Sequence, residues 1–313
     1  MNIKEVSKQK ELFTGGHRAC AGCGAAIVAR QTLMAAGPNT VIANATGCLE
    51  VVSTIFPYTA WNVPFLHSAF ENAGASISGI EALYKSWVRQ GKYDKKVNFI
   101  AFGGDGGTYD IGLQSLSGAV ERGHNILYIC YNNEAYMNTG VQRSGATPKG
   151  ADTTTAPVGK VKQGKEQYRK DLTEIMAAHK IPYVAQAVVG NWRDFTSKVE
   201  KALSIEGPKF INIFQPCRLG WAYKPELTCE IGRMAFETCV WPLYEVLNGQ
   251  YKITKPKEKK PIAEWIKLQG RFRHLVKPEN KALLDDIQAN IDKNWEFLLK
   301  KEAAFPAPVP AAK

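Results

Sequence analysis

The sequence lacks the features that mark several large classes of protein. It contains no apolar run approaching the roughly 18 residues that a membrane-spanning helix needs, so we expect no membrane span and no membrane partner. The N-terminal segment MNIKEVSKQKELF has no apolar core of the secretory type, which favours a cytoplasmic location. No zinc-finger spacing, RNP-type aromatic motif or GxGxxG fingerprint is present, which disfavours nucleic-acid binding and a dinucleotide fold.

Cysteine is also scarce, with 7 among 313 residues. That number is too small for a disulfide scaffold, and an odd number favours metal ligation or redox chemistry over bridges. Hydrophobic residues make up 45% of the chain, which is ordinary for a globular protein and excludes extensive disorder.

The charge is unevenly distributed. The 40 Lys and Arg against 29 Asp and Glu give a net charge of +11. Residues 251–313 hold fourteen basic and eight acidic residues, so this segment supplies +6 of it. A solvated basic surface is the simplest interpretation, and a dock for an acidic protein partner is the main alternative.

Alternating strand and helix patterns predict an α/β fold. Strands are expected at 40–45, 96–102, 125–131, 182–188 and 209–214, with helices at 24–36, 70–90, 110–123, 171–180 and 192–204. Residues 96–131 hold a strand, a glycine turn, a helix and a second strand. This order within about 35 residues indicates a right-handed βαβ unit. We therefore expect a doubly wound, mostly parallel sheet over 1–217. A helical C-terminal extension is expected over 218–303, with helices at 229–247, 261–274 and 278–302, and an extended tail over 304–313.

Polar residues follow two neighbouring predicted strands. Gly104-Asp105-Gly106 ends the first, and Asn132-Asn133 ends the second. The carboxyl ends of parallel strands meet at one sheet edge, where open α/β sheets bind ligands. Three oxygens could bind Mg²⁺ there, from Asp105, the side chain of Asn133 and the carbonyl of Ala135. Mg²⁺ usually takes its remaining ligands from substrate phosphates and water. Local turn hydrogen bonds would explain the motif less well. The spacing is typical of thiamine-diphosphate enzymes.

Four cysteines lie at predicted element edges and could converge. They are Cys20 and Cys23 of a CxxC pair, Cys48 and Cys217. Four thiolates suit either Zn²⁺ or an iron–sulfur cluster, and taken alone these residues leave cluster, zinc and unliganded thiols open. A neighbouring thiamine site favours the cluster as electron acceptor. The other cysteines are expected to be buried thiols without a role: Cys130, Cys229 and Cys239.

The chain closely resembles the β subunits of the pyruvate:ferredoxin oxidoreductase (pyruvate synthase) family, in the form assembled from separate subunits. The segments that carry the resemblance are HRACAGCGAA at 17–26, NATGCLEVVS at 44–53, PYTAWNVPFLHSAFENAGAS at 57–76, GGDGGTYDIGLQSLSG at 103–118, YNNEAYMNTGVQRSGATPKG at 131–150, ETCVWPLYEV at 237–246 and KKPIAEWIKLQGRFRHL at 259–275. The likeness covers nearly the whole chain.

The resemblance implies thiamine diphosphate, Mg²⁺ and one [4Fe–4S] cluster as cofactors. The family's cluster ligands fall on Cys20, Cys23, Cys48 and Cys217. Its magnesium ligands fall on Asp105, Asn133 and the backbone of Ala135, and its polar residue facing substrate falls on Asn138. We expect the cofactor contacts at Gly47, Cys48, Gly104, Asp105, Gly106, Gly107, Asn133, Ala135 and Asn138.

The glutamate that activates the aminopyrimidine ring lies on the partner α subunit in this family. Glu71 and Glu134 are therefore expected to have positioning roles. Asn132 stands where relatives often have Asp, which should not remove a ligand.

The resemblance also implies an activity, the reversible conversion of pyruvate and coenzyme A to acetyl-CoA and CO₂ with electrons passed to ferredoxin. The chain would act only with α-, γ- and δ-type sister subunits. Other substrates stay open, namely branched-chain 2-oxoacids, 2-oxoglutarate or oxalate, because much of the pocket would come from a partner. The alternatives from other classes are a cluster-free thiamine decarboxylase or synthase and a non-catalytic basic binding module. The intact GDG and NN pair argues against the last.

Overall fold

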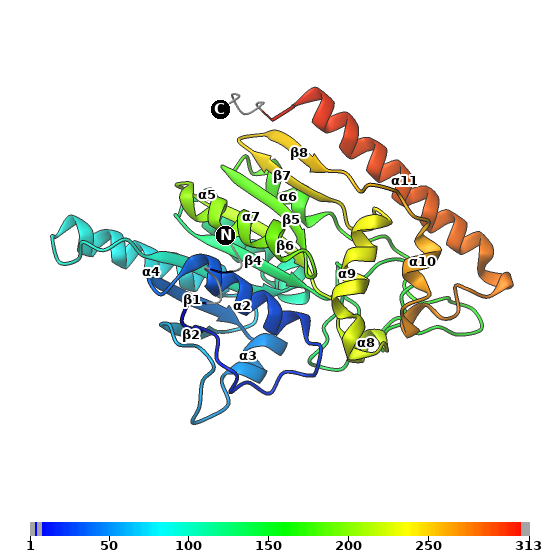
Figure 1. Cartoon of the computed structure of the whole chain (residues 1–313), viewed down its shortest axis with the longest axis horizontal. Coiled ribbons are helices and arrows are strands. Elements are labelled where there is room, and N and C mark those ends of the chain that lie inside the picture. The colour runs from blue at the N-terminus through cyan, green and yellow to red at the C-terminus, as the bar shows by residue number, and fades with distance from the viewer. Residues whose placement is uncertain (1–3, 5–7, 308–313) are drawn as a thin grey trace.

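The computed structural model describes residue 4 and residues 8–307. The strands of this part form one sheet in the order β2-β1-β3-β4-β6-β5-β7-β8 (Figure 1). The parallel strands are β1 (Thr40–Ala45), β2 (Phe65–Ser68), β3 (Asn98–Gly104), β4 (Leu127–Asn132), β5 (Tyr183–Val188) and β6 (Lys209–Phe214). Only β7 (Leu243–Leu247) and β8 (Gln250–Thr254), at one edge, pair antiparallel among these strands. The predicted mostly parallel sheet is confirmed.

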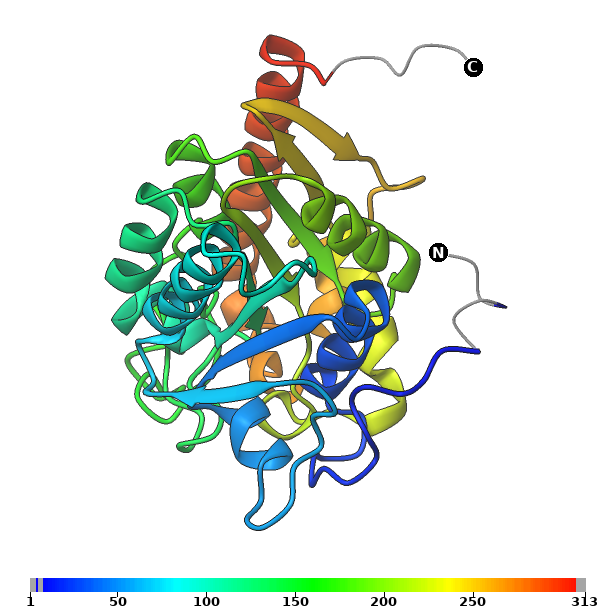
Figure 2. The ribbon, with the colours of Figure 1, turned by 90° about the vertical axis from the view of Figure 1, so that its left-hand side faces the viewer.

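Helices cover both faces of the sheet (Figure 2). On one face pack α4 (Ala73–Arg89), α5 (Leu113–Glu121), α6 (Leu172–Ala178) and α11 (Lys281–Ala304). On the other face pack α2 (Gly24–Ala36), α3 (Cys48–Ser53) and α7 (Trp192–Ser204). Because side chains alternate along a strand, β3 sends Phe99 and Ala101 into the first core and Ile100 and Phe102 into the second. This is the doubly wound arrangement that the sequence predicts.

The helix after the GDG turn begins earlier than the sequence indicates. A π-helical segment, η1 (Gly106–Ile111), starts directly after Asp105 and leads into α5. The prediction of a helix beginning at residue 110 is therefore wrong at its start. Consecutive glycines disfavour a helix by propensity, but here the absence of side chains allows the tight fit that the site requires.

The prediction of one helix over 229–247 is wrong in its second half. Helix α9 (Thr228–Glu237) ends early, and β7 and β8 follow as a hairpin. Asn248 and Gly249 form the turn with φ angles of 48° and 82°, as the primed hairpin turns require. The hairpin adds to the sheet through β5, so the C-terminal segment is not purely helical.

The remaining predicted C-terminal helices are shorter or divided. The segment 261–274 contains α10 (Ile262–Ile266) and the 3₁₀ turn η3 (Gly270–Phe272). The segment 278–302 contains the turn η4 (Pro278–Asn280) and then α11. The short elements α8 (Arg218–Trp221) and η2 (Pro225–Leu227) had no prediction.

Of the predicted tail over 304–313, residues 308–313 lie outside the described residues. The predicted first residue of the tail, Ala304, is the last residue of α11. Beyond the helix, Ala307 N donates to Tyr251 O at 3.1 Å. Within residues 4 and 8–307, no helix has the length and apolarity to cross a membrane.

The basic C-terminal segment is partly neutralised within the chain. Lys255 pairs with Glu302, Lys259 with Asp292 and Lys260 with Glu237. Asp292 and Glu302 are already counted in the +6 of residues 251–313, so these pairs leave most of that net charge in place, and both the solvated surface and the dock stay predictions.

Candidate cofactor and cluster site

A pocket of about 180 Å³ lies at the carboxyl edge of β1, β3 and β4, where each strand runs into a loop. Its walls come from residues 46–48, 104–107 and 135–139, with Phe70, Tyr131 and Asn133. All nine residues expected to contact a cofactor line it. The structure thus brings together segments that are distant in the sequence, at the edge where parallel sheets bind ligands.

Three oxygen atoms in this pocket face one another with no donor between them. Asn133 Oδ1 lies 2.8 Å from Ala135 O and 3.0 Å from Asp105 Oδ1. Turning the amide would instead give three hydrogen bonds, two donated to these oxygens and one accepted from Gln215 Nε2 at 3.1 Å, and this is the orientation that the protein atoms alone favour. Neighbouring ligands of an octahedral Mg²⁺ are about 2.9 Å apart, given Mg–O distances of roughly 2.0–2.1 Å. A bound Mg²⁺ would select the other orientation, in which Asn133 Oδ1 has this spacing from both of the other oxygens.

Asp105 is buried, with 1% of its surface exposed. It accepts hydrogen bonds from Ser144 Oγ at 2.6 Å and from Asn133 N at 3.1 Å. Burial raises the pKa of its carboxyl to about 7 despite these bonds, and nearby Glu134 adds to the rise. A cation bound to Asp105 would oppose that rise and favour the carboxylate.

The last two glycines of the GDGG segment, Gly106 and Gly107, are packed too closely for any side chain. A Cβ on Gly106 would lie 2.4 Å from the Tyr136 ring, and one on Gly107 would lie 2.9 Å from Phe70 O. The backbone is therefore exposed to the pocket, as close approach of a diphosphate requires.

We expect a Gly106→Ala complex to retain thiamine about tenfold more weakly, because the methyl group displaces Tyr136 from the pocket wall. A shift of that size costs about 1.4 kcal/mol. Gly79→Ala is the matched control, since Gly79 is exposed on α4 and a Cβ there meets nothing within 4 Å. It should stabilise the chain by about 0.5–1 kcal/mol. Equal thiamine affinity in both variants would contradict the packing argument, and isothermal titration measures it.

A buried ionic cluster supports the loop from behind. Glu134 is fully buried, and its carboxylate accepts from Arg169 Nη1 and Arg271 Nη2, each at 2.6 Å. The Arg271 guanidinium lies 3.5 Å from the ring centroid of Trp221, and Trp221 Nε1 donates to Asn133 O at 3.0 Å. The C-terminal segment thereby holds the backbone of a predicted magnesium ligand.

Glu134→Gln should destabilise the fold by about 3–5 kcal/mol, because it leaves buried Arg271 without its counter-charge. Differential scanning calorimetry of the assembled complex measures the loss. The control is Glu166→Gln, whose exposed pair with Lys162 (2.9 Å) should contribute at most about 1 kcal/mol. A similar unfolding temperature for both variants would show that the cluster does not support the loop.

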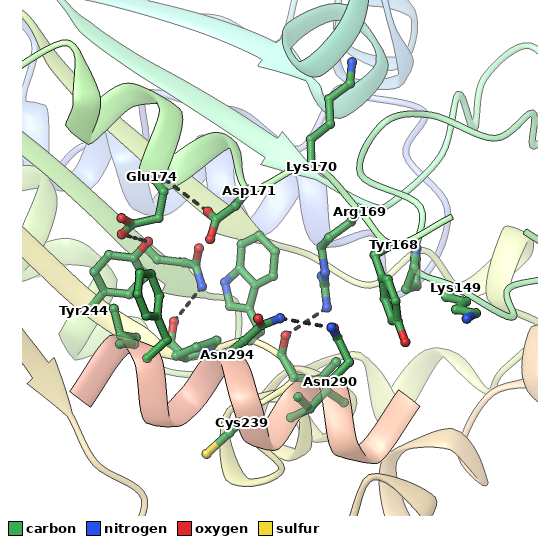
Figure 3. A pocket seen from close by; sticks show the side chains of 18 of the residues that line it. Lys149, Tyr168, Arg169, Lys170, Asp171, Glu174, Cys239, Tyr244, Asn290 and Asn294 are labelled. Atoms are coloured by element: carbon green, nitrogen blue, oxygen red, sulfur yellow. Dashed lines mark hydrogen bonds between the residues drawn. The ribbon is translucent and has the colours of Figure 1, made fainter. Parts of the chain in front are cut away.

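A larger cavity of about 490 Å³ lies behind this loop, beneath α11. Asn290 and Asn294 of α11 face Arg169 across it (Figure 3). Its lining cations are paired within the chain: Arg169 with Glu134, Lys170 with Asp110, Lys149 with Asp286 and Lys301 with Glu174. The larger cavity therefore offers an anion no unpaired cation among its described lining residues, and it lacks the predicted magnesium ligands that line the smaller pocket.

The predicted cluster cysteines lie near one another at the ends of three helices. Cys23 precedes α2, Cys48 begins α3 and Cys217 precedes α8. Burial raises the pKa of Cys48 to about 12, and Cys217, Cys23 and Cys20 are close enough to raise it further. The pKa values of Cys23 and Cys217 are also raised by burial, so these three buried thiols need a cationic centre to become thiolates.

Close backbone packing brings the CxxC loop to the segment around Cys217. A Cβ on Gly24 would lie 2.6 Å from Gln215 Oε1, and Thr228 Oγ1 donates to Gly22 O at 2.7 Å. These contacts join the start of α2 to the segment that follows β6.

Main-chain amides point at two of the sulfurs. Those of Ala25 and Ala26 oppose the rise in the pKa of Cys23, and those of Leu219 and Gly220 act likewise on Cys217. Hydrogen bonds to the sulfurs are one means by which proteins tune iron–sulfur clusters. In the described part of the chain, no three His, Cys, Asp or Glu side chains stand close enough to share one metal ion. A [4Fe–4S] cluster does not require that spacing, because each iron takes one thiolate. Four nearby thiols with amide donors at two of the sulfurs are the donor chemistry that a cluster would use.

Asn138 lies exposed at the open side of the pocket, and Met137 and Thr139 line the pocket on either side of it.

Three residues near the site were not identified from the sequence: Tyr131, Ser144 and Arg271. Tyr131 resembles an ordinary core residue of an apolar strand, and no local pattern distinguishes Ser144. Arg271 lies in the basic segment, where a surface location was expected.

Comparison with known proteins extends these observations. Residues 45–213 match the family described as thiamine pyrophosphate enzyme, C-terminal TPP binding domain. Pyruvate synthase subunit PorB of Methanocaldococcus jannaschii is 58% identical over 93% of this chain and 97% of the relative. Ketoisovalerate oxidoreductase subunit VorB of Pyrococcus abyssi is 45% identical over 95% of each.

Among solved structures, a chain of the 2-oxoglutarate:ferredoxin oxidoreductase from Magnetococcus marinus matches with a TM-score of 0.54 and 22% identity, over 69% of this chain and 68% of that one. At this identity the likeness shows the fold alone. The sequence matches reach further, and the chain belongs to the family of thiamine-pyrophosphate-dependent 2-oxoacid:ferredoxin oxidoreductase β subunits that includes pyruvate synthase subunit PorB.

Proposed function

We propose that the chain supplies the diphosphate half of a thiamine site and one [4Fe–4S] cluster to a multi-subunit pyruvate:ferredoxin oxidoreductase. One observation carries the proposal. Cys48, a predicted cluster ligand, lines the same pocket as Asp105, a predicted magnesium ligand. A cofactor held there would lie beside its electron acceptor.

Each group has a distinct role in this proposal. Asp105, the Asn133 side chain and the Ala135 carbonyl hold Mg²⁺ and, through it, the diphosphate. Bound thiamine diphosphate would supply the electron sink for decarboxylation of a 2-oxoacid. Cys20, Cys23, Cys48 and Cys217 hold the cluster that receives the electrons. Asn138, at the open side, orients the substrate.

The size of the pocket supports action within a complex. Its volume of about 180 Å³ is below the roughly 300–1,000 Å³ of complete small-molecule sites. Glu134 already pairs with two arginines and is unavailable as an acid for the aminopyrimidine ring. We therefore assign the other half of the cofactor site, with its glutamate, to an α-type subunit. The γ- and δ-type subunits and ferredoxin would complete the electron path.

Pyruvate with coenzyme A is the proposed substrate pair, and the VorB relative makes a branched-chain 2-oxoacid the second candidate. We expect the assembled complex to reduce a viologen dye, in a coenzyme-A-dependent reaction, with kcat/KM at least about tenfold higher for pyruvate than for 2-oxoisovalerate. That ratio corresponds to about 1.4 kcal/mol, within the range that a pocket gains by excluding extra methyl groups. A reversed order would overturn the choice of substrate and leave the cofactor assignments intact.

A further inference from the structure

The hydroxyl group of Tyr131 is buried and unpaired. Tyr131 lies near the end of β4 with 1% of its surface exposed, and its Oη has no hydrogen-bond partner among the described residues. Buried tyrosine hydroxyls normally find partners. Tyr109 Oη accepts from Asn212 Nδ2 at 2.8 Å, and Tyr128 Oη lies 3.2 Å from Thr108 Oγ1. Tyr131 is thus unlike the buried tyrosines around it.

Two glycines of the cofactor pocket leave room for this phenol. A Cβ on Gly47 would lie 2.7 Å from Tyr131 Oη, and one on Gly104 would lie 3.4 Å from it. Tyr131 lines the pocket together with Cys48 and Asp105. The hydroxyl therefore lies where the two proposed cofactors approach each other.

The hydroxyl has a proton to donate and no group to receive it. The Leu49 amide faces the phenol, but an amide can only donate. The phenolic proton is therefore left without an acceptor among the described residues. Of the groups named here, Cys48 gains acceptor strength when it becomes a ligated thiolate.

We propose that Tyr131 Oη donates a hydrogen bond to the sulfur of Cys48 when that cysteine binds the cluster, and so acts as a positioning residue that tunes electron acceptance. This inference rests on the function proposed above. Hydrogen bonds to cluster sulfurs change reduction potentials, and a donor favours the more negative, reduced state. The cluster is thereby easier to reduce by electrons leaving the cofactor.

The test compares the Tyr131→Phe and Tyr128→Phe complexes with the wild type, all purified without oxygen. Redox titration followed by electron paramagnetic resonance gives the midpoint potential of the cluster whose signal disappears in a Cys20→Ala complex. We expect Tyr131→Phe to weaken reduction about fivefold to tenfold, where tenfold is 59 mV for one electron. Tyr128→Phe, on the same strand but facing Thr108, should leave the potential unchanged. Iron and thiamine contents should match the wild type in both.

The variant should fold, because it removes a buried hydroxyl that has no partner. A wild-type complex without the Cys20-dependent signal would refute the proposed function itself. With the signal present, an unchanged midpoint in Tyr131→Phe overturns this inference alone. An equal shift of the midpoint potential in Tyr128→Phe would also overturn it. So would a Tyr131→Phe complex that loses iron, or one that loses thiamine without a shift of the midpoint potential.

Discussion

An Asp105→Asn complex should purify with almost no thiamine diphosphate. The change removes the single anionic oxygen among the three that face one another at 2.8 and 3.0 Å, and Mg²⁺ binds neutral oxygens alone much less well. Even residues that only orient a metal ligand cost about 10–100-fold in affinity when changed, so we expect at least about 100-fold weaker retention. Thiochrome fluorescence of the released cofactor measures it.

The fold itself should survive this change. Burial raises the pKa of Asp105 to about 7, so without a cation the carboxylate is unfavourable in the folded chain above that pH. A neutral amide removes that cost, and the cofactor-free variant should unfold at the same or a higher temperature at pH 8. Asp94→Asn, at an exposed position, is the control for thiamine content. Normal thiamine in the Asp105→Asn complex would refute the magnesium assignment.

A Cys20→Ala complex should lose electron transfer and keep its thiamine. Cys20 is exposed and lies outside the residues that line the cofactor pocket, so the diphosphate site stays intact. Without the fourth thiolate the cluster is not held, and reduction of ferredoxin should fall by more than about 100-fold, in proportion to the cluster lost. The assay is coenzyme-A-dependent ferredoxin reduction with pyruvate, together with thiamine content.

The prediction that Cys229 is buried is wrong, since it is an exposed thiol on α9. Its exposure makes Cys229→Ser the matched control for the Cys20 variant. It should transfer electrons at the wild-type rate. If Cys20→Ala did so too, the cluster-free thiamine enzyme would become the better account of this chain.

Local patterns in the sequence were sufficient for five of the six parallel strands, and the short edge strand β2 had no prediction. Strands 40–45 and 209–214 have the predicted bounds because apolar runs between turn signals identify buried strands. The convergence of Asp105 with Asn133 followed from one topological rule, that neighbouring parallel strands end at the same edge.

The features that the sequence did not reveal depend on contacts between distant segments. Glu134 and Arg271 are 137 residues apart, and Arg271 resembles one more cation of a basic segment. The hairpin of β7 and β8 was missed for another reason. Its Asn248-Gly249 turn is a strong hairpin signal, but the apolar spacing before it was interpreted as a continuing helix.

The central claim is that one chain holds both a thiamine site and an iron–sulfur cluster. Metal and sulfide analysis of the wild-type complex against the Cys20→Ala complex tests it most directly, because clusters on sister subunits cancel in the difference. The account predicts that the variant lacks about four irons and about four sulfides per chain, with no zinc at this site and equal thiamine. Stoichiometric zinc lost in place of iron, or no difference between the two complexes, would contradict it.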